Sequence, residues 1–265
     1  YSWLSAGLRE PVAAGGSATF RRLGEEQYLR SIESIFGAGI EIPGRFDPPR
    51  REEGLISVGS SRVVVSRSGF EQAELRARNI ASQVLSENHR SKVVDCDIED
   101  TSQYSEHCAG QFINQYGQLL YRRPLSGEER ASVLSIVKYA HGQAGAFYAG
   151  LEAGLARMLV SPNFLFRTEG VLEESIRDGI AKLDDYSLAA RISFLLWNAP
   201  PDDALLQAAA AGELQNDKAL ASQIDRMIAS PRFEGGVRAF FSDMFGYEQF
   251  SGLTKEQEIF PIYSS

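Results

Sequence analysis

The sequence has few of the residues that most often build metal and redox sites. It contains two cysteines and three histidines in 265 residues. The histidines (His89, His107 and His141) are scattered, and none has the partner four residues away that a helical zinc site needs. The glycine patterns of nucleotide sites and the Gly-x-Ser-x-Gly turn of hydrolases are also missing from the sequence. We therefore expect this chain alone to bind no metal and no cofactor.

Long apolar runs and an excess of positive charge are missing as well. No run of about 20 apolar residues, the length needed to cross a bilayer, occurs in the sequence. The formal net charge is -8, so the electrostatic field around the chain repels nucleic-acid phosphates. We expect neither a membrane span nor a nucleic-acid partner. Hydrophobic residues make up 43% of the chain, which is typical of a globular protein with a packed core.

The two cysteines lie twelve positions apart, and the polar segment between them has no helical pattern. We favour a disulfide between Cys96 and Cys108, which would stabilise the fold by about 3 kcal/mol in the chain-entropy model. It would also indicate an oxidising compartment. One alternative is two buried thiols in a cytosolic protein. A metal site is a weaker alternative, because the sequence has no Cys-x-x-Cys.

Apolar residues recur at helical spacing over most of the chain, and proline or glycine corners separate the periodic segments. This pattern predicts an all-α fold, an antiparallel multi-helix array. Residues 40–68 are predicted to be irregular because they contain three prolines and several glycines. Within them, Val63–Val65 form either a short strand or an extended apolar plug. The predicted helices lie within residues 19–37, 69–87, 108–123, 126–140, 147–160, 184–197, 202–212, 216–229 and 231–246.

Several helix starts have side chains that can accept hydrogen bonds from free amides. Ser68 is predicted to cap the second helix, Ser126 and Glu129 to form a capping box, and Asp184 to cap a later helix. Residues 158–164 and 227–233 share the pattern Met-aliphatic-x-Ser-Pro-x-Phe. This pattern predicts a helix end followed by a serine cap and a helix with proline in its first turn.

We divide the chain into three parts. Residues 1–18 are predicted to be a leader or linker, because they contain a proline and a glycine pair. Residues 19–125 are predicted to form an N-terminal helical lobe with the irregular insert and the Cys96–Cys108 loop. Residues 126–265 are predicted to form a C-terminal helical lobe that continues beyond this chain in the full protein.

Two groups of charged residues are candidates for a polar site. Arg122, Arg123 and Arg191 lie at or near apolar helical stripes, so we interpret them as ties between helices, with binding of an anionic substrate as the alternative. Asp202 and Asp203 follow two prolines, and we interpret their carboxylates as caps of the helix that starts there. The alternative is acid–base catalysis or cation binding. A deep polar pocket lined by Arg122, Arg191 or Asp202 would argue against a purely structural role. The sequence identifies no catalytic residue.

Aromatic residues concentrate between Phe233 and Phe250. We expect most of them to be buried. Exposure of Phe245, Tyr247 and Phe250 would instead indicate a docking surface for another domain or a platform for a carbohydrate-like ligand.

Three segments resemble one bacterial family: LLYRRPLSGEE (119–129), MLVSPNFLFR (158–167) and LAARISFLLWNAPPDDALLQAAAAGEL (188–214). The family is named domain of unknown function 1592, and FRRLGEEQYLRSIESIFG (20–37) is similar to the opening of the small domains that precede it. The resemblance implies an exported protein, located in the periplasm or at the cell surface, of a kind found in planctomycetes and proteobacteria. Such proteins often include a c-type cytochrome domain. Because this chain has no Cys-x-x-Cys-His, a haem c would belong to a partner or to a region outside the chain.

These observations favour an exported helical module with a structural or interaction role in a larger cell-envelope protein. Its partners would be other domains or subunits of an envelope assembly, with a c-type cytochrome among the candidates. The alternative is part of a redox or polymer-modifying envelope enzyme that works with a c-type cytochrome. In that case, regions outside this chain would complete the active site.

Overall fold

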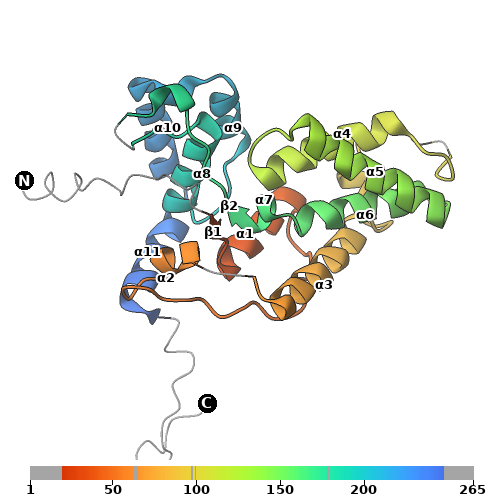
Figure 1. Cartoon of the computed structure of the whole chain (residues 1–265), viewed down its shortest axis with the longest axis horizontal. Coiled ribbons are helices and arrows are strands. Elements are labelled where there is room, and N and C mark those ends of the chain that lie inside the picture. The colour runs from red at the N-terminus through yellow and green to blue at the C-terminus, as the bar shows by residue number, and fades with distance from the viewer. Residues whose placement is uncertain (1–19, 63–64, 97, 99, 178–179, 248–265) are drawn as a thin grey trace, which may run out of the picture.

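The computed structural model describes residues 20–62, 65–96, 98, 100–177 and 180–247. Within these residues the fold is a helical array, as the sequence predicts, together with one small sheet that the sequence does not predict (Figure 1). In that sheet, β1 (Arg21–Arg22) pairs antiparallel with β2 (Phe166–Arg167), and Arg21 lies opposite Arg167. The helices are α1 (Glu25–Phe36), α2 (Ile56–Gly59), α3 (Arg67–Val84), α4 (Glu106–Tyr121), α5 (Gly127–Ala144), α6 (Phe147–Leu159), α7 (Pro162–Leu165), α8 (Asp185–Leu196), α9 (Asp203–Ala210), α10 (Asp217–Ala229) and α11 (Phe233–Phe245).

Short 3₁₀ turns link several of these helices. They are η1 (Ser60–Arg62), η2 (Arg90–Lys92), η3 (Glu173–Ser175) and η4 (Glu213–Gln215). No helix in the described part of the chain combines the length and the hydrophobicity that a bilayer crossing requires.

Polar side chains cap the helices close to where the sequence predicts. Ser126 Oγ accepts from the Glu129 amide, and the Glu129 carboxylate accepts from the Ser126 amide, which completes the capping box. Asp184 Oδ1 accepts from the Ser187 amide at 2.7 Å. The cap of α3 was predicted wrongly, because Ser66 rather than Ser68 accepts from the Gly69 amide. Both serines are followed by helix-forming residues, and only the extended backbone of Ser66 fits the cap position.

The two Ser-Pro corners differ in geometry. At the first, Ser161 caps α7, and Pro162 occupies the first turn as predicted. At the second, Ser230 Oγ accepts from the Arg232 amide, and α11 begins only at Phe233. The prediction of proline in the first helical turn is therefore wrong for this corner, where a turn separates Pro231 from the helix.

The irregular segment contains more local structure than the sequence predicts. It includes α2 and η1, together with a two-residue bridge between Glu52 and Leu55. Asp243 of α11 accepts hydrogen bonds from the amides of Ile56 and Ser57 at 2.7 and 3.0 Å, and so holds α2 against α11. The proposed strand at residues 63–65 lies largely outside the described residues, because residues 63 and 64 are not described.

Two hydrophobic clusters form the core. The larger joins α1, α3, α4, α5, α6 and α7, with Phe194 contributed by α8. The smaller joins α8, α9, η4 and α10 around Trp197, whose Nε1 donates to the Met227 carbonyl at 2.9 Å. Figure 1 shows the two groups of helices on opposite sides of the small sheet. The predicted division of the chain at residue 125 stays a prediction.

Hydrogen bonds between α1 and the end of α8 connect the two clusters. Gln27 Nε2 donates to Asn198 Oδ1 at 2.8 Å, and Asn198 Nδ2 donates to Glu26 Oε2 at 2.8 Å. Arg30 Nη1 donates to the carbonyl of Trp197 at 3.1 Å. These contacts join residues about 170 positions apart in the sequence.

A disulfide joins Cys96 and Cys108, with their Cα atoms 6.0 Å apart. Cys108 lies in the first turn of α4, where Ser105 caps the helix, and its side chain is buried in the larger cluster. The bridge therefore fastens the loop that precedes α4 to the core.

Candidate functional site

Arg122 is a buried tie between elements. It occupies the left-handed position that ends α4, with φ 59°. Its Nη2 donates to the carbonyls of Asn163 and Phe166 at 2.6 and 2.7 Å, where α7 passes into β2. Complete burial, with smaller contributions from Arg167 and Arg123, lowers its pKa to about 9. The guanidinium thus receives carbonyl acceptors from a neighbouring element, as the structural interpretation requires.

Arg123 is held by a carboxylate in a shared network. Its Nη1 and Nη2 each donate to an oxygen of Glu129 at 2.8 Å. Glu129 also accepts from the Ser126 amide and from Asn163 Nδ2. The hydrogen bond from Arg123, assisted by the others, lowers the pKa of Glu129 to about 2. This network fixes the corner between α4 and α5 against α7.

Asp202 and Asp203 lie at the start of α9. Asp202 Oδ1 accepts from the Leu205 amide at 3.0 Å, and both of its oxygens receive hydrogen bonds from Arg226 of α10. Burial opposes ionisation of Asp202, but these hydrogen bonds outweigh it and lower its pKa. Asp203 is exposed in the first turn of the helix. Neither carboxylate lines the cavity described below.

Arg191 differs from these residues because it lines a large cavity. It lies on α8 and pairs with Glu169, with Nη2 2.8 Å from Oε2. Both residues line a cavity of about 1130 Å³. The cavity is bounded by β1, α1, the irregular segment, α3, β2, α8 and α11. Its volume is about that of the larger small-molecule sites in proteins.

Two buried side chains at this cavity lack hydrogen-bond partners. Tyr28 of α1 is 2% exposed, and Arg76 of α3 is 5% exposed. Neither Tyr28 Oη nor Arg76 Nε has a partner. Arg76 Nη1 donates to the Arg45 carbonyl at 2.8 Å, and its guanidinium lies 4.2 Å from the centre of the Phe46 ring. The cation is therefore fixed in place while one donor remains unused.

A third unpartnered donor at the cavity belongs to β2. Arg167 Nε is buried and has no hydrogen-bond partner. Burial, with the cross-strand Arg21 as the next cause, lowers the pKa of Arg167 to about 10. A buried polar group without a partner costs about 1–3 kcal/mol. Three such groups lie on residues that line one cavity, and hydrogen-bond acceptors on a ligand in the cavity would explain why the fold keeps them.

The other charges of the cavity are mostly paired, and its walls are largely apolar. Arg22 pairs with Asp47 at 2.9 Å, and Arg191 pairs with Glu169. The lining includes six arginines and five carboxylates, and two of these carboxylates, Glu26 and Asp243, pair with Arg30 and Arg51 outside the lining. The apolar part of the wall includes Leu23, Phe46, Ile56, Phe194, Leu195, Phe240 and Met244.

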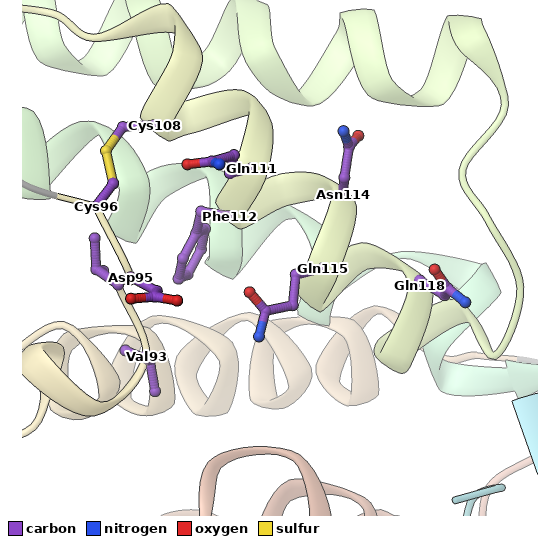
Figure 2. A pocket seen from close by; sticks show the side chains of 10 residues that line it. Val93, Asp95, Cys96, Cys108, Gln111, Phe112, Asn114, Gln115 and Gln118 are labelled. Atoms are coloured by element: carbon purple, nitrogen blue, oxygen red, sulfur yellow. A yellow bond between two sulfur atoms is a disulfide. The ribbon is translucent and has the colours of Figure 1, made fainter. Parts of the chain in front are cut away.

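A smaller groove lies beside the disulfide (Figure 2). Its volume is about 380 Å³, and the side chains of Gln111, Asn114, Gln115 and Gln118 line it along α4. Figure 2 shows Asn114 and Gln115 pointing in different directions from this helix. Asn114 Oδ1 already accepts from Arg130 at 3.0 Å. None of the unpartnered buried atoms of the described residues lies in this groove, so the larger cavity is the stronger candidate.

The aromatic residues of α11 are largely exposed. Phe240, Phe241 and Phe245 are 57%, 42% and 53% exposed, and Tyr247 is 52% exposed. Phe241, Phe245 and Tyr247 form a stacked series with ring centres 5.6 to 5.8 Å apart. The prediction that most of these aromatics are buried is therefore wrong for the described part of the chain. Phe250 lies outside the described residues.

Sequence reasoning found one residue of the cavity and missed the three with unpartnered atoms. Arg191 was a candidate, whereas Tyr28, Arg76 and Arg167 were not. Arg76 had a usable signal, because it lies beside Ala73, Ala77 and Ile80 on the face of α3 that packs into the core. Among the described residues, no group of three or more histidine, cysteine and acidic side chains has the arrangement of a metal site.

Comparison with known proteins identifies two families in the chain. Residues 183–265 match PSD4, protein of unknown function (DUF1592), and residues 108–169 match PSD5, protein of unknown function (DUF1595). No curated protein and no solved structure matches the chain. The cavity is lined by both matched regions and by α1 and α3, which precede them. These two parts of the chain are therefore similar to two families of unknown function, with the DUF1595 match before the DUF1592 match.

Proposed function

We propose that this chain is a binding module of an exported cell-envelope protein and that it takes a small ligand in the large cavity. The observation that carries this proposal is the set of buried, unpartnered polar atoms on one cavity, Tyr28 Oη, Arg76 Nε and Arg167 Nε. In a purely structural core, such groups would be paired or replaced by apolar ones. A ligand with acceptor atoms supplies the missing partners.

The other candidate residues support this interpretation by contrast. The guanidiniums of Arg122, Arg123 and Arg226 all have carbonyl or carboxylate acceptors within the fold. They hold elements together and leave no donor group facing the large cavity. Of the five unpartnered buried side-chain atoms in the described part of the chain, three therefore belong to residues that line the space for a ligand.

The location in the cell envelope rests on the disulfide and on the family. A Cys96–Cys108 bridge is stable in an oxidising compartment and rare in the cytosol. We propose that the partners of the module are other domains or subunits of an envelope assembly, a c-type cytochrome among them. The exposed aromatic series on α11 is consistent with such a contact. A role within a redox or polymer-modifying enzyme stays a prediction.

A blocking substitution tests whether the cavity binds ligands. Ala239 of α11 lines the cavity and is partly exposed, so Ala239→Trp places a bulky side chain in the cavity. The probe is the dye 8-anilinonaphthalene-1-sulfonate, whose fluorescence rises in apolar sites. We expect saturable binding at one site in the full chain and its loss in Ala239→Trp.

Two control variants separate the cavity from other surfaces. Ala131→Trp adds the same side chain at an exposed position of α5, and Phe245→Ser removes part of the exposed aromatic series. Both should bind the dye as the unaltered chain does. If Ala239→Trp binds the dye normally, or if only Phe245→Ser loses it, the cavity is not the binding site.

A further inference from the structure

The Tyr28–Arg76 end of the cavity has the chemistry of a carboxylate receptor. Arg76 is held by the Arg45 carbonyl on one side and by the Phe46 ring on its face, with the Tyr28 ring 5.7 Å away. This fixed orientation lowers the entropy that a guanidinium loses when it binds an anion. Its Nε–H is a buried donor without a hydrogen-bond partner.

Tyr28 supplies a second donor at the same place. Burial raises its pKa to about 12, although the nearby Arg76 acts in the opposite direction. The phenol therefore stays protonated at neutral pH and can donate a hydrogen bond. A cationic donor and a neutral donor side by side match an acceptor with two oxygens and one negative charge.

Charge and apolar lining restrict the ligand further. Among the described residues, Arg76 forms no ion pair with a carboxylate, and arginines outnumber carboxylates in the cavity lining. The carboxylate of a ligand would balance the charge of Arg76. The walls formed by Phe46, Phe194 and Phe240 would contact an apolar ligand body.

We propose that the cavity binds an organic monocarboxylate with an apolar body, and that its carboxylate accepts hydrogen bonds from Arg76 and Tyr28. This inference rests on the proposed function, because it names the class of ligand for the same cavity. Arg167, the third residue with an unpartnered donor, lies over the Phe194 ring, with its guanidinium 5.1 Å from the ring centre. It would serve a polar group elsewhere on the ligand.

A ligand series on the unaltered full chain tests the carboxylate preference. The probes are octanoate, octan-1-ol, octylamine and inorganic phosphate, each measured by isothermal titration calorimetry at pH 7. We expect octanoate to bind about tenfold or more tightly than octan-1-ol, because a hydrogen bond to a charged group contributes that much. Octylammonium and inorganic phosphate should bind more weakly than octanoate. Equal affinities for octanoate and octan-1-ol would overturn the inference.

Substitutions assign the preference to particular residues. Arg76→Gln should abolish the preference for octanoate over octan-1-ol, and Tyr28→Phe should reduce it about two- to tenfold. Two matched controls should leave it unchanged. Arg78→Gln removes an exposed arginine of the same helix, and Tyr139→Phe removes the hydroxyl of a tyrosine that is 70% exposed. Equal effects of Arg76→Gln and Arg78→Gln would contradict the assignment.

The outcomes distinguish this inference from the proposed function. If octan-1-ol and octanoate bind equally and Ala239→Trp blocks both, the cavity is a ligand site without a carboxylate receptor. If no amphiphile binds, the proposed function fails together with the inference. Because the ligand series uses the unaltered chain, it stays decisive even if Arg76→Gln does not fold.

Discussion

Individual arginines in this protein differ in how many acceptors the fold gives them. Arg122 has backbone carbonyls, Arg123 has both oxygens of a carboxylate, and Arg76 has one carbonyl and an unused Nε. The sequence places arginines near apolar stripes but does not say which acceptors surround them. Those acceptors come from residues 41 to 44 positions away for Arg122 and 31 positions away for Arg76. For this reason, the sequence could predict that arginines tie helices together, but it could not predict which arginine donors lack an acceptor.

Glu129 is the residue for which the effect of pH is clearest. Its folded-state pKa of about 2 lies below the usual 4.5. Its ionised form therefore stabilises the fold above about pH 4.5, and that stabilisation is lost as the pH falls towards 2. We expect Glu129→Gln to lower the free energy of unfolding by about 2 kcal/mol at pH 7. The difference from the unaltered chain should shrink at pH 2.

Urea denaturation at pH 7, 4 and 2 measures this effect. Glu128→Gln is the matched control, because Glu128 lies in the same first turn of α5 and is exposed. It should change the unfolding free energy by only a few tenths of a kcal/mol. If Glu129→Gln changes the free energy of unfolding equally at pH 7 and pH 2, the charge of Glu129 does not contribute to stability.

Helix positions were predicted well because their signals are local. The Ser126–Glu129 box, the Asp184 cap and the corner prolines all act within one turn of the helix that they start. The surroundings of a helix depend instead on distant segments. The sequence of α11 has the apolar spacing of a buried helix, yet Phe240, Phe241 and Phe245 are exposed among the described residues. Periodicity shows that a helix has an apolar face, but it does not identify what covers that face.

Gly236 sets how closely α11 approaches α8. A Cβ atom at this position would collide with the carbonyl of Leu196 at the end of α8. We expect Gly236→Ala to destabilise the protein by about 1–3 kcal/mol, because backbone atoms cannot move aside as a flexible side chain can. Thermal unfolding followed by circular dichroism measures the change.

Gly142 provides the opposite case in α5. It lies inside the helix, and a Cβ there would meet no atom within 4 Å. Gly142→Ala should therefore stabilise the protein by about 0.5–1 kcal/mol through helix propensity. If Gly236→Ala raises the unfolding midpoint as Gly142→Ala is expected to do, the close approach of α11 to α8 does not limit stability.

At the scale of the whole molecule, the two hydrophobic clusters are unequal. The smaller one around Trp197 contains far fewer buried residues than the larger one. The large cavity lies where α1 and α3 of the first group face α8 and α11. Opening the smaller cluster therefore exposes less buried apolar surface than opening the larger one. We expect the smaller cluster to unfold locally before the larger cluster does. The sequence predicted helices in both clusters but not this division, because the division depends on which apolar faces meet.

Hydrogen exchange measured by mass spectrometry tests the separate stability of the smaller cluster. Leu205→Ala removes a fully buried side chain from it, and Leu155→Ala is the matched change in the larger cluster. We expect Leu205→Ala to accelerate amide exchange in α8, α9 and α10 while α3 to α6 keep their protection. Leu155→Ala should affect both groups. Uniform acceleration by Leu205→Ala would mean that the molecule opens as one unit.

The hydrogen bonds from α1 to the end of α8 have a consequence for dividing the protein into fragments. A polypeptide cut at the DUF1592 match, residues 183–265, would lose Gln27 and Glu26, which hold Asn198, and Arg30, which caps the Trp197 carbonyl. It would also lose five of the seven elements that bound the cavity, β1, α1, the irregular segment, α3 and β2. The boundary of the family match and the physical boundary therefore differ, and recombinant fragments intended for binding studies should begin before residue 20.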